Sequence, residues 1–293
     1  TSLQRVAWTA DGWLRLDHGE GDQGSILPEV EVAVPPRRPG FPARRATTLR
    51  TGERPATGDQ ADDFDGPELD PRFLSLRIPL GQDSQSLFDR PGWLRLKGRE
   101  SLASRFHQSL VARRWQVFRF SACTVIEAEP ADFHHAAGLI CLYDHENWYY
   151  LALTHDEDHG GRCLKVLASD NGNWTEEAAL AVPAGPLALR VEVDWDRLKF
   201  AWAGLGGEEL AGEGDLGQHA SGLAGAGQDA VAKGAHLDRL AWKRIGRELD
   251  ASKLSDEHCR EGWFTGAMVG LCCQDLSGQR RSADFDGFWY RER

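Results

Sequence analysis

The side chains best suited to hold a metal ion are the two histidines and three carboxylates of HDEDH, residues 155–159. Histidines at i and i+4 share one face of a helix, and zinc proteases use such a pair to bind Zn²⁺. Here the glutamate occupies the wrong position of that motif, and the segment lies between an alternating strand pattern and a Gly-Gly pair. We therefore predict a hairpin turn and no metal site.

Two copies of DFDG, residues 63–66 and 284–287, offer four more carboxylates. In a strand the phenylalanine of each copy would point inward and the flanking aspartates outward. The first and last strands of a sandwich are often neighbours, so these carboxylates could crowd together and bind a cation such as Ca²⁺. The spacing fails the EF-hand pattern. We favour the alternative, solvated strand starts and turn caps, and expect no metal and no cofactor.

The cysteines lack the paired spacing of a zinc site and the density of a disulfide scaffold. They are Cys123, Cys141, Cys163, Cys259, Cys272 and Cys273. Several lie inside apolar strand patterns, where a thiol behaves as a small hydrophobic group. We expect inert buried thiols in a reducing compartment, by default the cytoplasm; a disulfide or a reactive thiol is the alternative.

Composition narrows the range of partners. The 293 residues carry 34 basic and 45 acidic side chains, a net charge of -11. Such a surface repels phosphate backbones and anionic lipids, so neither nucleic acid nor a membrane is an expected partner. No apolar run approaches the roughly 20 residues that cross a bilayer. The 11 Trp and 12 Phe residues are ample for a buried core, and a soluble protein is expected.

Short alternating apolar and polar runs, each closed by Asp, Asn or Gly, dominate the chain after residue 63. The clearest runs are residues 115–129, 137–143, 147–154, 162–168, 187–195, 198–203, 239–245, 266–273 and 283–290. Many short strands without a normal amphipathic helix predict an all-β fold, an antiparallel β-sandwich.

Three regions differ in composition. Residues 1–34 contain two strand-like runs, LQRVAW and DGWLRL, and residues 35–62 form a Pro-rich linker at a domain boundary. Residues 63–293 are the sandwich. Within it, residues 204–236 are crowded with Gly and Ala and cannot bury enough surface to offset their ordering entropy, so we predict a mobile hairpin insertion.

Several stretches of the sandwich region resemble one known family. They are residues 63–79, 91–116, 137–151, 249–258 and 262–290. Together they resemble the C-terminal concanavalin-A-like domain of the β-xylosidase branch of family 43 glycoside hydrolases. The resemblance implies a jelly-roll sandwich. It also implies that residues 1–34 are the closing strands of an otherwise absent five-bladed β-propeller, the catalytic domain of that family.

The resemblance implies exo-acting, inverting hydrolysis of xylo-oligosaccharides by the upstream propeller. In that reaction one carboxylic acid protonates the leaving oxygen and a second carboxylate activates water. By resemblance these groups lie upstream of Thr1, so we assign no catalytic residue here. Acidic residues of this chain fall at turns or in the insertion, where we expect exposure to water to leave the pKa of their carboxyl groups in the usual range. Whether this chain counts as an enzyme stays open; it is expected to be part of a β-xylosidase or α-arabinofuranosidase type hydrolase.

The loop GWFTG, residues 262–266, carries the one substrate contact that the resemblance implies. In relatives this loop sets an aromatic ring at the mouth of the xylose site, which by motif position is Phe264, with Trp263 beside it. A ring there would stack on the apolar face of a pyranose and block longer chains. The alternative is that Phe264 belongs to the sandwich core.

Three functions compete at this point. The sandwich could cap the propeller and complete its substrate site. It could instead be a stand-alone carbohydrate-binding module that uses exposed Trp148, Tyr149 or Trp174. It could also be architectural and assemble subunits into a homo-oligomer. We favour the capping role because the resembling stretches include the GWFTG loop.

Overall fold

The computed structural model describes residues 6–8, 14–16, 60–205, 237–261 and 266–293. The chain divides into two units, Thr1–Pro55 and Ala56–Arg293. In the first unit β1 (Val6–Trp8) pairs with β2 (Leu14–Leu16) antiparallel, which confirms strands in both predicted runs. The rest of residues 1–34, and the linker up to residue 59, lie outside the described residues. Across the described part of the chain, no helix has the length and apolar character that spanning a membrane requires.

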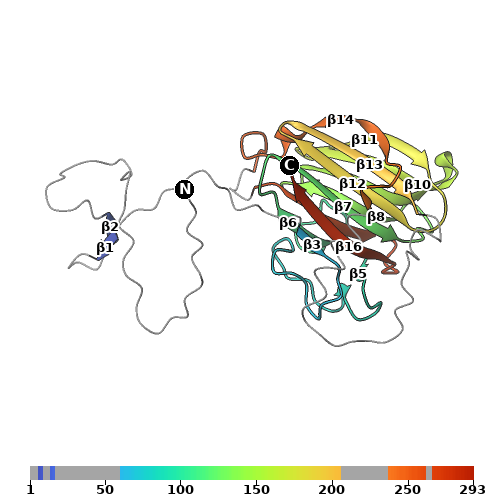
Figure 1. Ribbon diagram of the computed structural model, residues 1–293, viewed down its shortest axis with the longest axis horizontal. Helices are drawn as coiled ribbons and strands as arrows, with labels where there is room; N and C mark the ends of the chain where they lie inside the picture. Colours follow the sequence, from blue (N-terminus) through green and yellow to red (C-terminus); the bar gives the residue numbers. More distant parts are fainter. Residues whose placement is uncertain (1–5, 9–13, 17–59, 206–236, 262–265) are drawn as a thin grey trace. The chain divides into compact units, whose positions relative to one another are not determined.

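The second unit is built from two antiparallel sheets (Figure 1). The eight-stranded sheet contains β3 (Gln60–Asp62), β4 (Gln85–Ser86), β5 (Leu94–Lys97), β7 (Arg119–Glu127), β12 (Leu187–Asp194), β13 (Arg197–Gly204), β14 (Lys243–Asp250) and β16 (Ser282–Glu292). The six-stranded sheet contains β6 (Ser109–Arg114), β8 (His135–Leu142), β9 (Trp148–Asp156), β10 (Gly161–Asp170), β11 (Asn173–Ala181) and β15 (Met268–Asp275).

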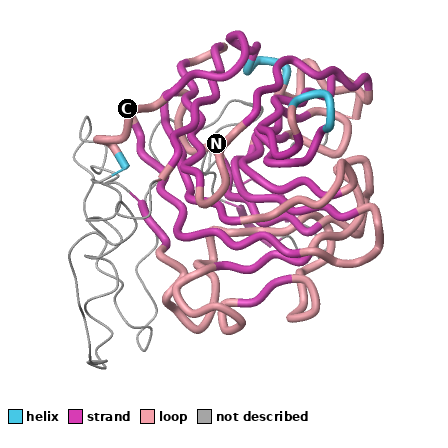
Figure 2. Tube along the Cα trace, turned by 90° about the vertical axis from the view of Figure 1, so that its right-hand side faces the viewer, coloured by secondary structure: helices cyan, strands magenta, loops and turns pink. Residues whose placement is uncertain are grey.

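The order of the strands is β14-β13-β12-β7-β16-β5-β4 in the first sheet, with β3 also paired to β16, and β11-β10-β9-β8-β15-β6 in the second. Figure 2 shows that strands make up most of this unit and that the short helices lie at its margin. The prediction of an all-β antiparallel sandwich is confirmed.

The sandwich begins earlier than the sequence suggested. Strand β3 pairs with the last part of β16, with Gln60 opposite Tyr290 and Asp62 opposite Phe288. The first strand of the sandwich therefore starts three residues before the boundary expected at residue 63. Its short polar sequence, QAD, carries no apolar alternation, because an edge strand is stabilised by its backbone bonds to one neighbour.

The second DFDG copy lies within β16 and changes the phase of that strand. The register against β7 shifts between Asp286 and Phe288, and Gly287 has a φ of 76°, which is the left-handed conformation that favours glycine in a bulge. Because the bulge adds one residue, Phe285 and Phe288 both reach the core between the sheets. Strict alternation would have put Phe288 on the outer face.

The six-stranded sheet is buried on both faces at its centre, in β8 and most of β9, whereas its edge strand β11 is exposed or half-buried. Its inner face joins the main core through residues such as Leu139 and Leu151. Its outer face forms a second cluster that includes Ile140 and Trp148, packed with Leu102 from the connection before β6. All eight residues of β8 are buried for this reason. A strand buried on both faces reads as a continuous apolar run, as GLICL does.

Two strands differ most from their predicted bounds, and a third was not predicted. The run 115–129 contributes β7 only from Arg119, so residues 115–118 form a connection. The run 239–245 contributes only its last residues to β14, which continues to Asp250. Strand β11 was not predicted, because its sequence NWTEEAALA is polar at its start and lies at the edge of the sheet.

Candidate functional site

The end of the sandwich at which β3 begins carries a stacked pair of exposed aromatic side chains and a cavity. We call it the β3 end. Strand β6 ends there and β7 starts there, since Tyr290 on β16 lies opposite both Gln60 and Ala122. The turn between β12 and β13 and the connection from β14 to β15 lie at the same end, because these strands are antiparallel to their neighbours.

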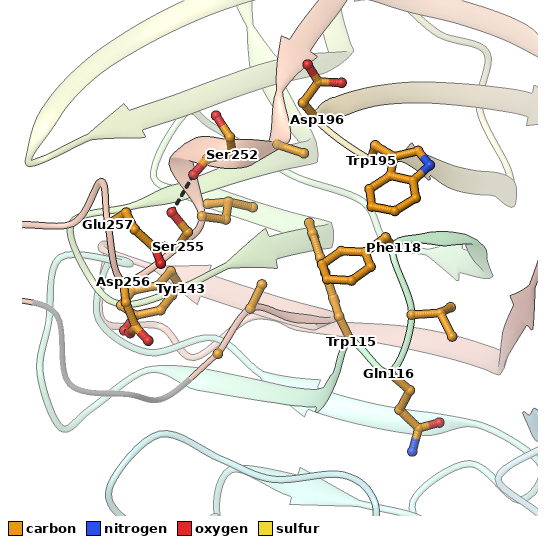
Figure 3. Close-up of a pocket in the computed structure, with 15 residues that line it drawn as sticks. Trp115, Gln116, Phe118, Tyr143, Trp195, Asp196, Ser252, Ser255, Asp256 and Glu257 are labelled. Carbon is orange, nitrogen blue, oxygen red and sulfur yellow. Dashed lines mark hydrogen bonds between the residues drawn. The ribbon is translucent and has the colours of Figure 1, made fainter. Parts of the chain in front are cut away.

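The cavity at the β3 end has a volume of about 680 Å³ and mostly apolar walls. Its lining comes from the β6–β7 connection, the β12–β13 turn and the segment after β14 (Figure 3). The lining residues are Trp115, Gln116, Val117, Phe118, Tyr143, Trp195, Asp196, Ala251, Ser252, Leu254, Ser255, Asp256, Glu257, Gly266 and Ala267. A volume of this size accommodates a sugar ring or several side chains of a partner protein.

One side of the cavity is an aromatic pair, Phe118 and Trp195. The two rings are stacked, with centroids 5.1 Å apart and an interplanar angle of 6°. Both are exposed, Phe118 at 67% and Trp195 at 57%. Two large exposed rings that stack on each other are typical of a contact surface, because burying their apolar area against a partner removes it from water.

Local backbone geometry holds this pair in place. Trp195 has a φ of 58°, a conformation that costs energy in a tryptophan, and its backbone N–H donates to the Phe118 carbonyl at 2.8 Å. The turn flanks, Asp194 and Arg197, are joined by an ion pair. The tight two-residue turn therefore presents Trp195 outward, where Phe118 from another connection lies against it.

The opposite side of the cavity is polar. It is formed by a 3₁₀ turn, Ala251–Lys253, and the residues after it. The Ser255 hydroxyl donates to the Ser252 carbonyl at 2.7 Å, and the Tyr143 hydroxyl donates to Asp256 (Figure 3). An aromatic surface facing hydroxyls and carboxylates can bind a partner through stacking and hydrogen bonds.

Trp263 and Phe264, the predicted substrate contacts, lie outside the described residues. Gly266, the last residue of their loop, is described and lines the cavity together with Ala267. The Trp115 backbone N–H donates to the Ala267 carbonyl at 2.9 Å. The described end of the loop therefore lies beside the β6–β7 connection that carries Phe118. The role of both predicted contacts stays a prediction.

The aromatic residues proposed for a binding module are mostly buried, and this part of that hypothesis is wrong. Trp148 is packed in the outer cluster of the six-stranded sheet, and Tyr149 lies in the main core. Trp174 alone of the three is exposed, at 49%, and its ring packs edge-on against Trp148. The error arose because β9 is buried on both faces of its sheet, so the side chains that point to either face are shielded from solvent.

Sequence reasoning also missed the aromatic pair. Phe118 lies in a run that reads as continuous strand, and Trp195 ends another such run. The signal that could have found Trp195 is its place between Asp194 and Asp196, since flanking aspartates mark a turn and a tryptophan at a turn tip is exposed.

The side chains of the two candidate metal sites serve as turn caps and ion-pair partners. HDEDH forms the predicted hairpin turn, a 3₁₀ turn Glu157–His159 in which Asp156 caps the start and Gly160 ends it. Hydrogen bonding to Lys165 lowers the pKa of Asp156 to about 2. In the second DFDG copy, Asp284 binds Arg95 through two bonds of 2.7 and 2.8 Å and Arg90 at 3.0 Å.

Among the residues described here, no three His, Cys, Asp or Glu side chains are grouped to hold a metal. The thiols of Cys141, Cys163, Cys259, Cys272 and Cys273 are free and buried. Burial raises the pKa of Cys272 to about 12, so it carries no reactive thiolate.

Comparison with known proteins gives a consistent result. Residues 61–221 and 229–291 match the family described as "Beta xylosidase C-terminal Concanavalin A-like domain". A putative beta-xylosidase of Escherichia coli is 34% identical over 99% of this chain and 45% of its own length, and a beta-xylosidase of Bacillus subtilis is 35% identical over 81% and 39%.

Among solved structures, a xylan beta-1,4-xylosidase from Bacillus halodurans superimposes with a TM-score of 0.67 at 32% identity, over 99% of this chain and 46% of that one. This chain thus spans less than half the length of each of these three relatives.

Proposed function

Because this chain belongs to the family of beta-xylosidase C-terminal concanavalin A-like domains, we propose that it is the accessory, non-catalytic part of a glycosidase and that its β3 end docks on an upstream catalytic domain. The observation that carries this proposal is the exposed Phe118–Trp195 pair beside a 680 Å³ cavity, at the end where the chain enters the sandwich. An upstream domain would connect to the sandwich through β3, so it would meet this end first.

The ionisable groups of the sandwich support a non-catalytic role. A glycosidase acid needs a raised pKa and a position beside the sugar. Hydrogen bonds from Lys253 and His258 instead lower the pKa of Asp170 to about 2, so this carboxylate stays ionised. Burial raises the pKa of Asp62 and Asp63, but neither lines the cavity at the β3 end.

The substrate and partners follow from the same proposal. The relatives named as beta-xylosidases support a xylo-oligosaccharide cleaved from its end, with Phe264 and Trp263 at the mouth of the sugar site. In this proposal residues 1–34, with paired β1 and β2, are the last strands of a propeller, and the enzyme is a cytoplasmic homo-oligomer. Five free buried thiols support a reducing compartment.

Removing the aromatic pair is expected to weaken docking. Between this chain and a catalytic domain, Phe118→Ser with Trp195→Ser removes two rings from the contact, at a cost of about 2 kcal/mol or more. Produced as separate pieces, the two domains should then bind at least about 30-fold more weakly by calorimetry. Phe133→Ser with Trp174→Ser, which also removes two exposed rings, is the matched control. Equal loss in both double variants would contradict the docking role.

The Phe264 assignment has its own test. Phe264→Ala in the longer protein should raise KM for a nitrophenyl xyloside about tenfold and let longer oligosaccharides compete, because the stacking surface is lost. Circular dichroism should show an unchanged sandwich. Kinetics equal to the parent would mean that Phe264 does not contact substrate.

A further inference from the structure

A second cavity lies on the flank of the sandwich, where the edge strands of the two sheets, β11 and β14, contact each other. Figure 1 shows these strands together at one margin of the sandwich. The cavity has a volume of about 700 Å³. Its lining residues are Tyr149, Ala168, Asp170, Asn171, Asn173, Thr175, Glu177, Arg247, Leu249, Asp250, Lys253 and Arg260. We call it the flank cleft.

The walls of the flank cleft are more polar than those of the cavity at the β3 end, with Tyr149, Ala168 and Leu249 forming their apolar part. Carboxylates, amides and a hydroxyl come from β10 and β11, and cations come from β14 and the segment after it. Sugar hydroxyls both donate and accept hydrogen bonds, so they are best bound by walls that offer both kinds of group. The flank cleft has this chemistry.

Ion pairs hold the side chains of the cleft in place. Asp170 accepts from Lys253 at 2.6 Å and from His258 at 2.7 Å. Arg247 reaches from β14 to Glu177 on β11 at 2.6 Å, and so joins the two sheets. These pairs place carboxylate, ammonium and guanidinium groups on both walls of the cleft, where they can accept hydrogen bonds from a polyol and donate to it.

Arg260 is the one cation of the lining whose guanidinium makes no bond to another described residue. Its backbone N–H donates to the Asn171 side chain at 2.9 Å, which fixes its position at the rim. Asp170 and Glu177 are already paired, and Asp250 accepts from Ser252 in its own turn. Asp250 has no cationic partner among the described residues either, so the lining carries equal numbers of carboxylates and cations. What remains at the rim is the Arg260 guanidinium, unpaired among the described residues, beside a wall that can bind hydroxyl groups.

From this combination we infer that the flank cleft binds a sugar that carries a carboxylate, a uronic acid. The guanidinium of Arg260 would bind the carboxylate of the sugar through two parallel hydrogen bonds. Asn173 and the ion-paired carboxylates of the cleft would bind the hydroxyls of the sugar ring. A phosphate fits less well, because a dianion needs more than one unmatched cation. The inference does not depend on the docking proposal, since the cleft is formed by the sandwich alone.

The test uses this chain with D-glucuronate, D-xylose, acetate and inorganic phosphate as probes in calorimetry and ligand-observed NMR. Glucuronate should bind about tenfold or more tightly than the other three, since each lacks either the charge or the hydroxyls. Arg260→Gln should weaken glucuronate binding about tenfold, and Asn173→Ala should weaken it without changing the response to acetate. Arg244→Gln, an exposed arginine on β14 outside the cleft, should leave it unchanged.

Three outcomes would overturn the inference. Glucuronate could fail to bind, acetate or phosphate could bind as tightly as glucuronate, which would mean a simple anion site, or Arg260→Gln could behave like Arg244→Gln. Because docking is measured only with the catalytic part present, failure of this test and failure of the proposed function are distinguishable.

Discussion

Replacing Gly270 by alanine should destabilise the sandwich by about 3 kcal/mol or more, the upper part of the range for overpacked sites. Gly270 lies in the middle of β15, opposite Ala112 on β6 and Ile140 on β8. A Cβ added there would lie 2.1 Å from the Val111 carbonyl oxygen and 2.4 Å from the Ala112 Cα. Both are backbone atoms of the neighbouring strand, so the clash is relieved only if β6 and β15 part.

The matched control is Gly204→Ala, the same chemical change at the end of β13. There the nearest atom to an added Cβ is in Pro183, at 3.7 Å, which is ordinary van der Waals contact. We expect the free energy of unfolding of this variant to lie within about 0.5 kcal/mol of that of the parent. Urea unfolding of the two variants measures the difference, and equal midpoints would contradict the close approach of β6 and β15.

The regular strands could be predicted because their side chains alternate. Runs such as LALRVEVD place every second residue in the core, and the structure confirms β12 with only its end displaced. Polar edge strands could not be found in this way. Strand β11 is stabilised by its pairing with β10, and β3 by its pairing with β16; both pairings are backbone contacts that leave no apolar pattern.

Which aromatic residues are exposed was the least predictable feature of the candidate site. Tyr149 is buried because it faces the main core, and Trp148 is buried because a connection from earlier in the chain covers the outer face of the sheet. Single-strand patterns carry no information about such a cover. Trp195 and Phe118 are exposed because a tight turn and a connection bring them together across 77 residues of sequence. Tertiary packing decides both cases.

The largest expected effect of all concerns catalysis. If the carboxylates that break the glycosidic bond belong to another domain, this chain alone supplies no acid, no base and no activated water to a xyloside. Enzymes accelerate such reactions by about a millionfold or more. We therefore expect measurable xyloside hydrolysis from a complete enzyme and none above the uncatalysed rate from this chain alone. Cationic partners hold the pKa of Asp156 and of Asp170 low, so neither carboxyl group is protonated at neutral pH as a general acid must be.

The decisive measurement is the release of nitrophenol from 4-nitrophenyl xyloside by this chain alone and by the longer protein that joins it to a catalytic part, such as that of the Escherichia coli relative. We predict no release above the buffer rate from the chain alone and sustained turnover from the longer protein. Turnover by the chain alone that is abolished by substituting one of its own residues would contradict the proposed division of roles.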